Sequence, residues 1–154
     1  MKVSLLGILL ALQIAIEAVP SDFALQVTYK GCFAETFDTF ERTFTREIRP
    51  GVDAKADLEL SVGQRARLFE LVRSADLFSY PALFAPPRPP FSEPVKEITL
   101  TVHADDRRHT IQWVDYGDSS DKSVRLRTML GRIMQVALEL PAVRSLPDSE
   151  IFCL

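Results

Sequence analysis

The stretch "KEITLTVHADDRRHTIQWVDY", residues 96–116, decides the fold because it carries two alternating apolar runs around a polar centre. Such alternation is typical of strands that bury one face, and two runs joined by a short polar segment predict a β-hairpin. In a sheet that is covered on one side only, the apolar positions of both runs must share the covered face. These positions are Ile98, Leu100, Val102, Ile111 and Trp113.

The shared face restricts the hairpin to a two-residue turn, either Asp105 with Asp106 or Asp106 with Arg107. A register shifted by one residue would point one of the apolar runs away from the core. Both turns place His103 and His109, the only histidines of the chain, on opposite faces of the sheet. They therefore cannot bind one ion together, and no metal site is predicted. We expect His103 to face solvent and His109 to lie at the edge of the core.

Two strands are predicted before this hairpin. Residues 23–33 alternate apolar and polar side chains, which indicates a half-buried strand. Residues 38–48, "DTFERTFTREI", place Phe40, Phe44 and Ile48 on one parity. The spacing by four also suits a helix, but the density of threonines and the following turn "RPG" favour a second strand.

Two helices complete the pattern. Ser61 and Gln64 have the spacing of a capping box and predict a helix over residues 62–75. A second apolar stripe predicts a helix over residues 123–140, which ends before Pro141. The expected fold class is α+β, a four-stranded antiparallel sheet with two helices packed on one face, in the order β-β-α-β-β-α. Residues 19–154 are expected to form a single domain.

The beginning of the chain has the features of a signal peptide. Lys2 precedes an uncharged apolar stretch over residues 3–16, shorter than the ~20 residues of a membrane-spanning helix. Small Ala18 predicts cleavage before Val19, so residues 1–18 are interpreted as a signal peptide and the protein as secreted or periplasmic; an uncleaved anchor is the alternative. In an exported protein, Cys32 and Cys153 either form a disulfide or both remain unpaired.

Composition and motifs exclude several functions. The 154 residues are 47% apolar and 25% charged with a formal charge of −3, and they lack the basic stripe that nucleic-acid binding requires. No nucleophile elbow or phosphate loop is present, so neither a catalytic site nor a cofactor is predicted. Asp115, Asp118 and Asp121 either bind calcium or, as the spacing favours, form a turn that caps the next helix.

The run "SYPALFAPPRPPFSEP", residues 79–94, is expected to have two parts. Tyr80, Leu83 and Phe84 are predicted to join the core. The prolines that follow hold an extended backbone, which either recognises a partner or serves as a stiff spacer.

Four pieces of the chain, "VTYKGCFAE", "LSVGQRARLFELVRSADLFSYP", "EITLTVHADDRRHTIQWVDYGD" and "LRTMLGRI", resemble the emfourin type of inhibitor of thermolysin-family metalloproteases in order and spacing. The resemblance covers roughly residues 25–138, and Cys32 stands where the family tends to have a second glycine. The positions that match the family are Gly31, Phe33, Ala34, Asp76, Phe78, Tyr80, Pro81, His109 and Thr110.

The resemblance implies a small α+β protein that inhibits a metalloprotease, or a related exported domain that shares the fold without that activity. We therefore expect an exported binding protein whose partner is a secreted metalloprotease and which has no membrane span after signal cleavage. The alternatives are an envelope-associated structural or accessory protein without inhibitory activity, and a small hydrolase with an unrecognised site. The candidate binding residues are Gly31, Phe33, Pro86, Pro87, Arg88, Pro89, Pro90 and Phe91.

Overall fold

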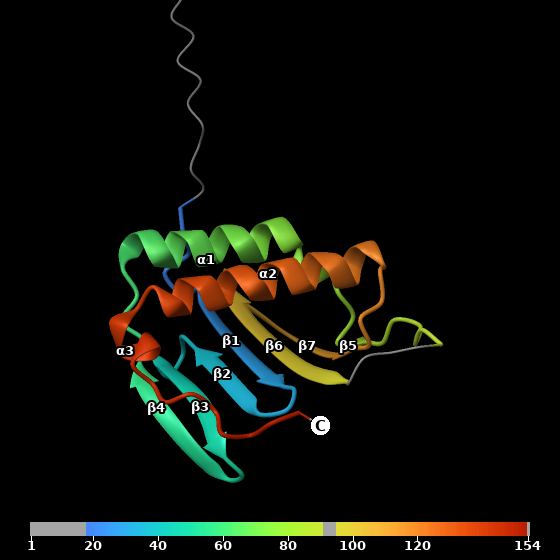
Figure 1. Ribbon diagram of the computed structural model, residues 1–154. Coiled ribbons are helices and arrows are strands. Elements are labelled where there is room, and N and C mark those ends of the chain that lie inside the picture. The colour runs from blue at the N-terminus through green and yellow to red at the C-terminus, as the bar shows by residue number, and fades with distance from the viewer. Residues whose placement is uncertain (1–17, 91–94, 154) are drawn as a thin grey trace, which may run out of the picture.

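The computed structural model describes residues 18–90 and 95–153. It confirms the α+β class but not the four-stranded antiparallel sheet: the sheet has seven strands in the order β4-β3-β2-β1-β6-β7-β5 and is mixed, because β5 runs parallel to β7. Helices α1 and α2 lie on one face of it (Figure 1). In chain order the elements are β1 (Ala24–Lys30), β2 (Ala34–Asp38), β3 (Thr43–Arg49), β4 (Val52–Asp57), α1 (Val62–Ala75), η1 (Leu77–Ser79), β5 (Leu83–Phe84), β6 (Lys96–Ala104), β7 (Arg107–Asp115), α2 (Asp121–Leu138) and α3 (Pro141–Arg144).

The single strand predicted over residues 38–48 is wrong, because a turn interrupts it. The carboxylate of Asp38 accepts hydrogen bonds from the N–H groups of Phe40 and Glu41 at 2.8 and 3.0 Å, and Arg42 has a φ of 55°. The chain therefore reverses between β2 and β3. It reverses again at Gly51, whose φ is 71°, and continues into the unpredicted strand β4.

The β6–β7 hairpin confirms one of the two predicted turns. Ala104 pairs with Arg107, so the turn residues are Asp105 and Asp106, both with positive φ. Asp22 holds this turn, because its carboxylate accepts the N–H groups of Asp105 and Asp106 at 3.0 and 2.8 Å. These backbone hydrogen bonds, that of Asp106 first, lower the pKa of Asp22 below its usual value.

Both helices begin at side-chain caps. Helix α1 occupies the predicted residues, and its capping box joins Ser61 and Gln64. Helix α2 begins two residues earlier than predicted because the side chain of Ser120 accepts the N–H of Ser123. Asp121 lies in its first turn, which confirms the capping alternative for this loop.

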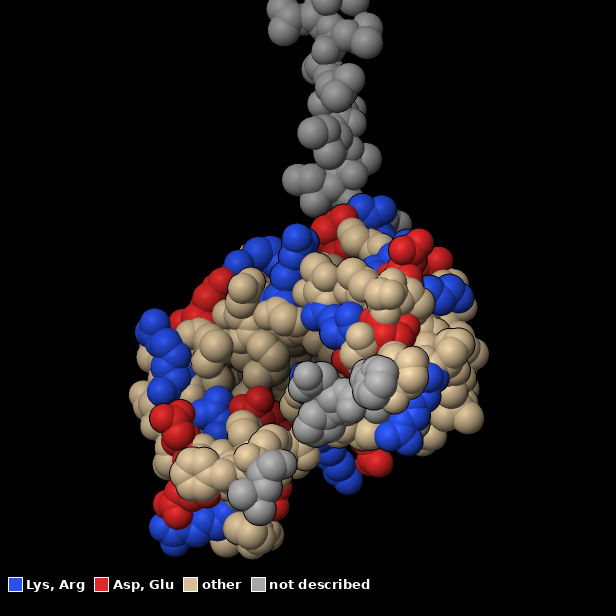
Figure 2. Space-filling view, turned by 45° about the vertical axis from the view of Figure 1, so that its right-hand side comes forward, with Lys and Arg blue, Asp and Glu red and all other residues tan. Residues whose placement is uncertain are grey.

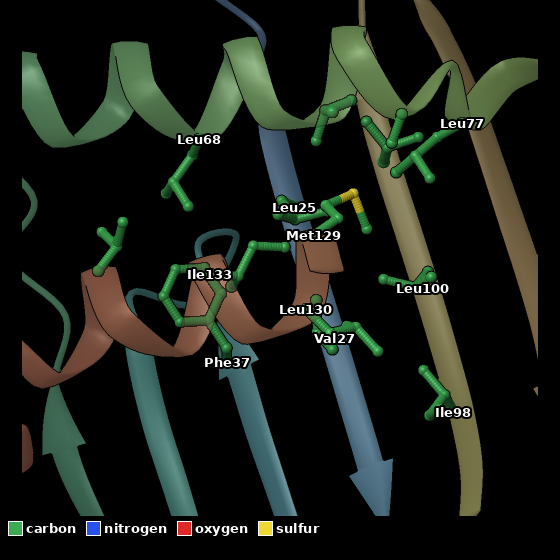
Figure 3. Packing of buried hydrophobic residues seen from close by; sticks show 14 of the residues in the cluster. Leu25, Val27, Phe37, Leu68, Leu77, Ile98, Leu100, Met129, Leu130 and Ile133 are labelled. Carbon is green, nitrogen blue, oxygen red and sulfur yellow. The ribbon is translucent and has the colours of Figure 1, made fainter. Parts of the chain in front are cut away.

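The core fills the space between the helices and one face of the sheet. Figure 3 shows leucine and isoleucine side chains of α1 and α2 pointing toward strands β2, β1 and β6. On the sheet, pairing aligns Phe44, Phe37, Val27, Leu100 and Ile111 in one row across five strands, and all of them are buried. This row forms the sheet side of the hydrophobic core.

The segment after α1 corrects a smaller prediction. Tyr80 is buried as expected, and Phe84 is half-buried against the rings of Tyr80 and Trp113. Leu83, which was also expected in the core, is 65% exposed. The reason is that β5 alternates like any strand, so its two side chains point to opposite faces of the sheet.

The carboxyl-terminal tail, predicted as a loop, contains the short helix α3 and then crosses the sheet toward the β1–β2 turn (Figure 1). Glu150 fixes it to β3: its N–H donates to the carbonyl of Ile48 at 2.8 Å, and its carboxylate accepts two hydrogen bonds from Arg49. At the end of the tail, Cys153 forms a disulfide with Cys32, with their Cα atoms 5.2 Å apart. Of the two alternatives for the cysteines, the structure has the paired one.

The predicted signal peptide lies almost entirely in residues 1–17, outside the described residues. Within residues 18–90 and 95–153, no helix combines the length and the apolar character that crossing a bilayer requires.

The disulfide closes a loop with a sequence separation of 121 residues. Since such a loop restricts the unfolded chain, we predict that the double variant Cys32→Ser, Cys153→Ser loses about 2–5 kcal/mol of unfolding free energy. Urea denaturation followed by circular dichroism measures this. The wild-type protein in excess dithiothreitol should match the variant, and equal midpoints for the oxidised wild type and the variant would contradict the prediction.

Glu139, just beyond α2, links the two helices through hydrogen bonds from Arg67 and Gln64 of α1. The Arg67 hydrogen bonds, followed by that of Gln64, lower the pKa of Glu139 from 4.5 to about 2. A lowered carboxyl pKa stabilises the folded state above the unfolded value, so this contribution is lost as the pH falls from 4.5 to about 2. We predict that Glu139→Gln flattens the pH dependence of the urea midpoint across this interval, with Glu59→Gln as an exposed control. An unchanged slope in the Glu139 variant would refute the assignment.

Candidate functional site

The predicted binding residues come from two segments that are distant in the chain and that the sheet brings to the same end of its strands. Gly31 and Phe33 form the β1–β2 turn, which the N–H of Gly31 closes by donating to the carbonyl of Phe33 at 3.2 Å. The last residue of β1 pairs with Glu97 near the start of β6. The guanidinium of Arg88 lies 5.3 Å from the ring centroid of Tyr116, which follows β7. Because β6 and β7 are adjacent, the turn and the proline-rich segment flank the same end of the sheet.

We call this end of the sheet the rim: the β1–β2 turn with Cys32 and Cys153, and residues 85–90, of which Arg88 lies over the ring of Tyr116. Its predicted members differ in exposure. Gly31, Pro87, Arg88 and Pro90 are exposed, Phe33 and Pro89 are half-buried, and Pro86 is buried and anchors its segment; Phe91 lies outside the described residues. The rim therefore presents some of its predicted contacts to solvent and uses others to hold its own shape.

A cleft opens behind the rim, between the sheet and α2. Its floor includes Glu35, Tyr29 and Ile98, which are neighbours in the next row of paired residues on the inner face of the sheet. Arg46 continues this row on β3, beside the cleft. The cleft has a volume of about 430 Å³. Figure 2 shows a hollow between the helix layer and the tail, with uncharged side chains inside it and charged side chains around it. The cleft is lined by Val27, Tyr29, Glu35, Lys96, Ile98, Asp115, Arg127, Leu130, Gly131 and Met134.

Both carboxylates of the cleft are matched by arginines. Arg46 donates to Glu35 at 2.7 Å, and Arg127 donates to the two oxygens of Asp115 at 3.2 and 2.9 Å. Lys96 has no ion pair within the described part of the chain. Among the described residues, Lys96 is therefore the positive charge of the cleft that no carboxylate pairs, and its partner across the strands is Asp115.

The loop before α2 supports Arg127 from a second side. The guanidinium of Arg127 donates to the backbone carbonyl of Asp118, whose carboxylate lies 3.6 Å away. Burial alone would raise the pKa of Asp118, but hydrogen bonds from Ser120 and Ser123 and the charge of Arg127 together lower it. A carboxyl group that acts as a general acid needs a raised pKa. The arrangement thus favours a fixed structural ion pair over acid catalysis by Asp118.

Gly131 is the one residue of the cleft that the sequence pattern could have revealed. It lies inside α2, where glycine destabilises a helix by about 1 kcal/mol relative to alanine. A Cβ atom built at this position would meet no atom within 4 Å, so packing does not require glycine here. The other lining residues come from five different elements, and although residues within one element have helical or strand spacing, no spacing in the sequence joins the elements to one another.

One group of potential metal ligands occurs among the described residues, formed by Asp22, His103 and Asp106 with ligand atoms within 4.8 Å of one another. Both oxygens of Asp22 already accept backbone N–H groups of the β6–β7 turn. The group therefore has a clear role in holding the hairpin. His109 lies on the other face, as predicted, with its Nε2 2.7 Å from the carbonyl oxygen of Tyr80.

The ion pair in the cleft wall gives a test of this geometry. The Asp115 side chain is 4% exposed, and we predict that Arg127→Met, which leaves its charge unpaired, costs about 3 kcal/mol of unfolding free energy. Arg127→Lys keeps the charge but loses the guanidinium that reaches Asp115 through Nε and the Asp118 carbonyl through Nη2, so the loss of unfolding free energy should be smaller. Urea denaturation measures both variants. A wild-type midpoint for Arg127→Met would show that the pair does not hold the cleft wall.

Comparison with family models and with curated proteins identified no relative of this chain. No protein-family model matches the chain, and no curated protein matches it. The resemblance to emfourin-type inhibitors accordingly rests on the sequence motifs quoted above.

Proposed function

We propose that the protein is an exported binding protein that inhibits a secreted thermolysin-family metalloprotease by surface complementarity. The observation that carries this proposal is the rim, where the Cys32–Cys153 disulfide ties the β1–β2 turn to the tail. A loop held in one conformation before binding loses little entropy when a partner docks. Protease inhibitors commonly bind with such preordered backbones.

The chemistry of the rim suits a protein partner. Phe33 is a half-buried aromatic side chain, and Arg88 is an exposed guanidinium stacked near Tyr116. Aromatic and arginine side chains contribute most often to protein-binding energy. The motifs shared with the emfourin type include Gly31 and Phe33, so the resemblance and the rim point to the same turn.

Export is part of the same proposal. The disulfide supports it, since disulfides persist in oxidising compartments such as the periplasm and the extracellular space. Amino-terminal sequencing of the protein recovered from such a compartment should begin at Val19, following the signal peptide proposed from the sequence.

The inhibition test uses purified oxidised protein against a panel of secreted metalloproteases of the thermolysin type. We predict that at least one is inhibited, and that Phe33→Ala and Arg88→Ala each raise the inhibition constant about tenfold or more, as loss of a central contact does. Arg132→Ala is the matched control for Arg88→Ala, because Arg132 is an exposed arginine in the groove between α1 and α2.

Two results would contradict the proposal. One is the failure of stoichiometric protein to slow any protease in the panel. The other is inhibition that is equally strong in the two rim variants and the Arg132 control, which would place the contact surface elsewhere on the molecule.

A further inference from the structure

The cleft beneath α2 has a glycine where a side chain would fill it. Gly131 lines the cleft from inside the helix, and a Cβ atom there would meet nothing within 4 Å. Neither helix stability nor packing against the protein accounts for glycine at this position. Glycine allows another molecule to approach the backbone closely, which indicates that this part of the cleft is kept open.

The surface next to Gly131 is apolar. Val27 and Ile98 lie at the floor from β1 and β6 and are only 3% and 2% exposed, while Leu130 and the half-buried Met134 form the wall from α2. The volume of about 430 Å³ lies within the ~300–1,000 Å³ range of small-molecule pockets. An apolar hollow of this size gains free energy when an apolar chain displaces its water.

The charges at the mouth of the cleft determine which polar headgroup a bound apolar chain can carry. Lys96 is on the same face of β6 as Ile98, because side chains two positions apart in a strand point the same way. The acidic groups of the cleft are already paired with Arg46 and Arg127. Of the two cations that line the cleft, Lys96 and Arg127, only Lys96 has no ion pair within the described part of the chain, so the mouth is complementary to an anion.

We propose that the cleft binds a single-chain amphiphile with a carboxylate headgroup, such as a fatty acid. The chain lies along Gly131 between α2 and the floor, and the carboxylate contacts the ammonium group of Lys96. This site is separate from the rim and does not depend on a protease partner.

The only tryptophan of the chain supplies the measurement. Trp113 pairs with Ile98 of the cleft floor, so a chain bound against Ile98 changes its surroundings. Titration of the oxidised protein with dodecanoate, below the micellar concentration, should give a saturable change in tryptophan emission with one equivalent bound. Isothermal titration calorimetry gives the dissociation constant independently.

Three variants and one altered ligand locate the binding mode. Gly131→Leu fills the cleft and should abolish saturable binding, whereas Gly63→Leu, the same change on α1, should bind like the wild type. Lys96→Ala should weaken dodecanoate binding about tenfold, as loss of one charge-assisted hydrogen bond does. The uncharged ligand dodecanol should bind more weakly than dodecanoate to the wild type and equally to Lys96→Ala and the wild type.

The proposal is overturned if dodecanoate produces no saturable signal, or if Gly131→Leu binds it as well as Gly63→Leu does. Equal binding of dodecanoate to Lys96→Ala and the wild type overturns the assignment of the carboxylate to Lys96. Protease inhibition by the same preparations is a separate readout, so failure here is distinguishable from failure at the rim.

Discussion

The antiparallel pairing of β1 with β6 is the constraint on which the rest of the structure depends. It joins the β2–β3–β4 meander to the β6–β7 hairpin, and its register places Val27 opposite Leu100. A slip of one residue would point the apolar side chains of β1 away from the helices. The same register sets Lys30 opposite Glu97, so the end of β1 and the start of β6 lie together. The disulfide between Cys32 and Cys153 fixes the carboxyl-terminal tail to this end of the sheet.

The side chains on the inner face of the sheet change from apolar in one row to partly charged in the next, and this change in polarity creates the cleft. The row through Val27 is apolar across five strands and lies under the helices. The next row begins with the Arg46–Glu35 ion pair and becomes apolar toward Ile98. Paired charges cannot be buried under a helix without loss of hydration, whereas an apolar surface left open is suited to a ligand. Because Gly131 adds no side chain, α2 leaves open space beside this second row, in which Tyr29 and Glu35 are half-buried and Ile98 is buried.

Sequence patterns predicted an element correctly where the interactions that form the element lie within one segment of the chain. The capping box at Ser61 marked the start of α1, and the alternation around Asp105 marked the β6–β7 hairpin. The strand proposed over residues 38–48 failed because Phe40 continues the parity of Phe44 although it lies in a turn. That turn depends on the carboxylate of Asp38, a residue that alternation alone assigns to a strand. Strand β5 has only two residues, and it forms by pairing with β7, which follows it by about thirty positions in the chain. No local sequence pattern therefore predicts it.

The sequence by itself determined the α+β class, the two main helices, a β-hairpin with one of two possible turns, and the opposite faces of the two histidines, because each follows from spacing within one segment. Only the tertiary structure decided the seven-strand order, the pairing of Cys32 with Cys153, and the assembly of the rim and the cleft. The physical reason is that these features depend on register between strands distant in the chain. Spacing within a segment shows which side chains share a face, whereas strand order shows which of those faces meet.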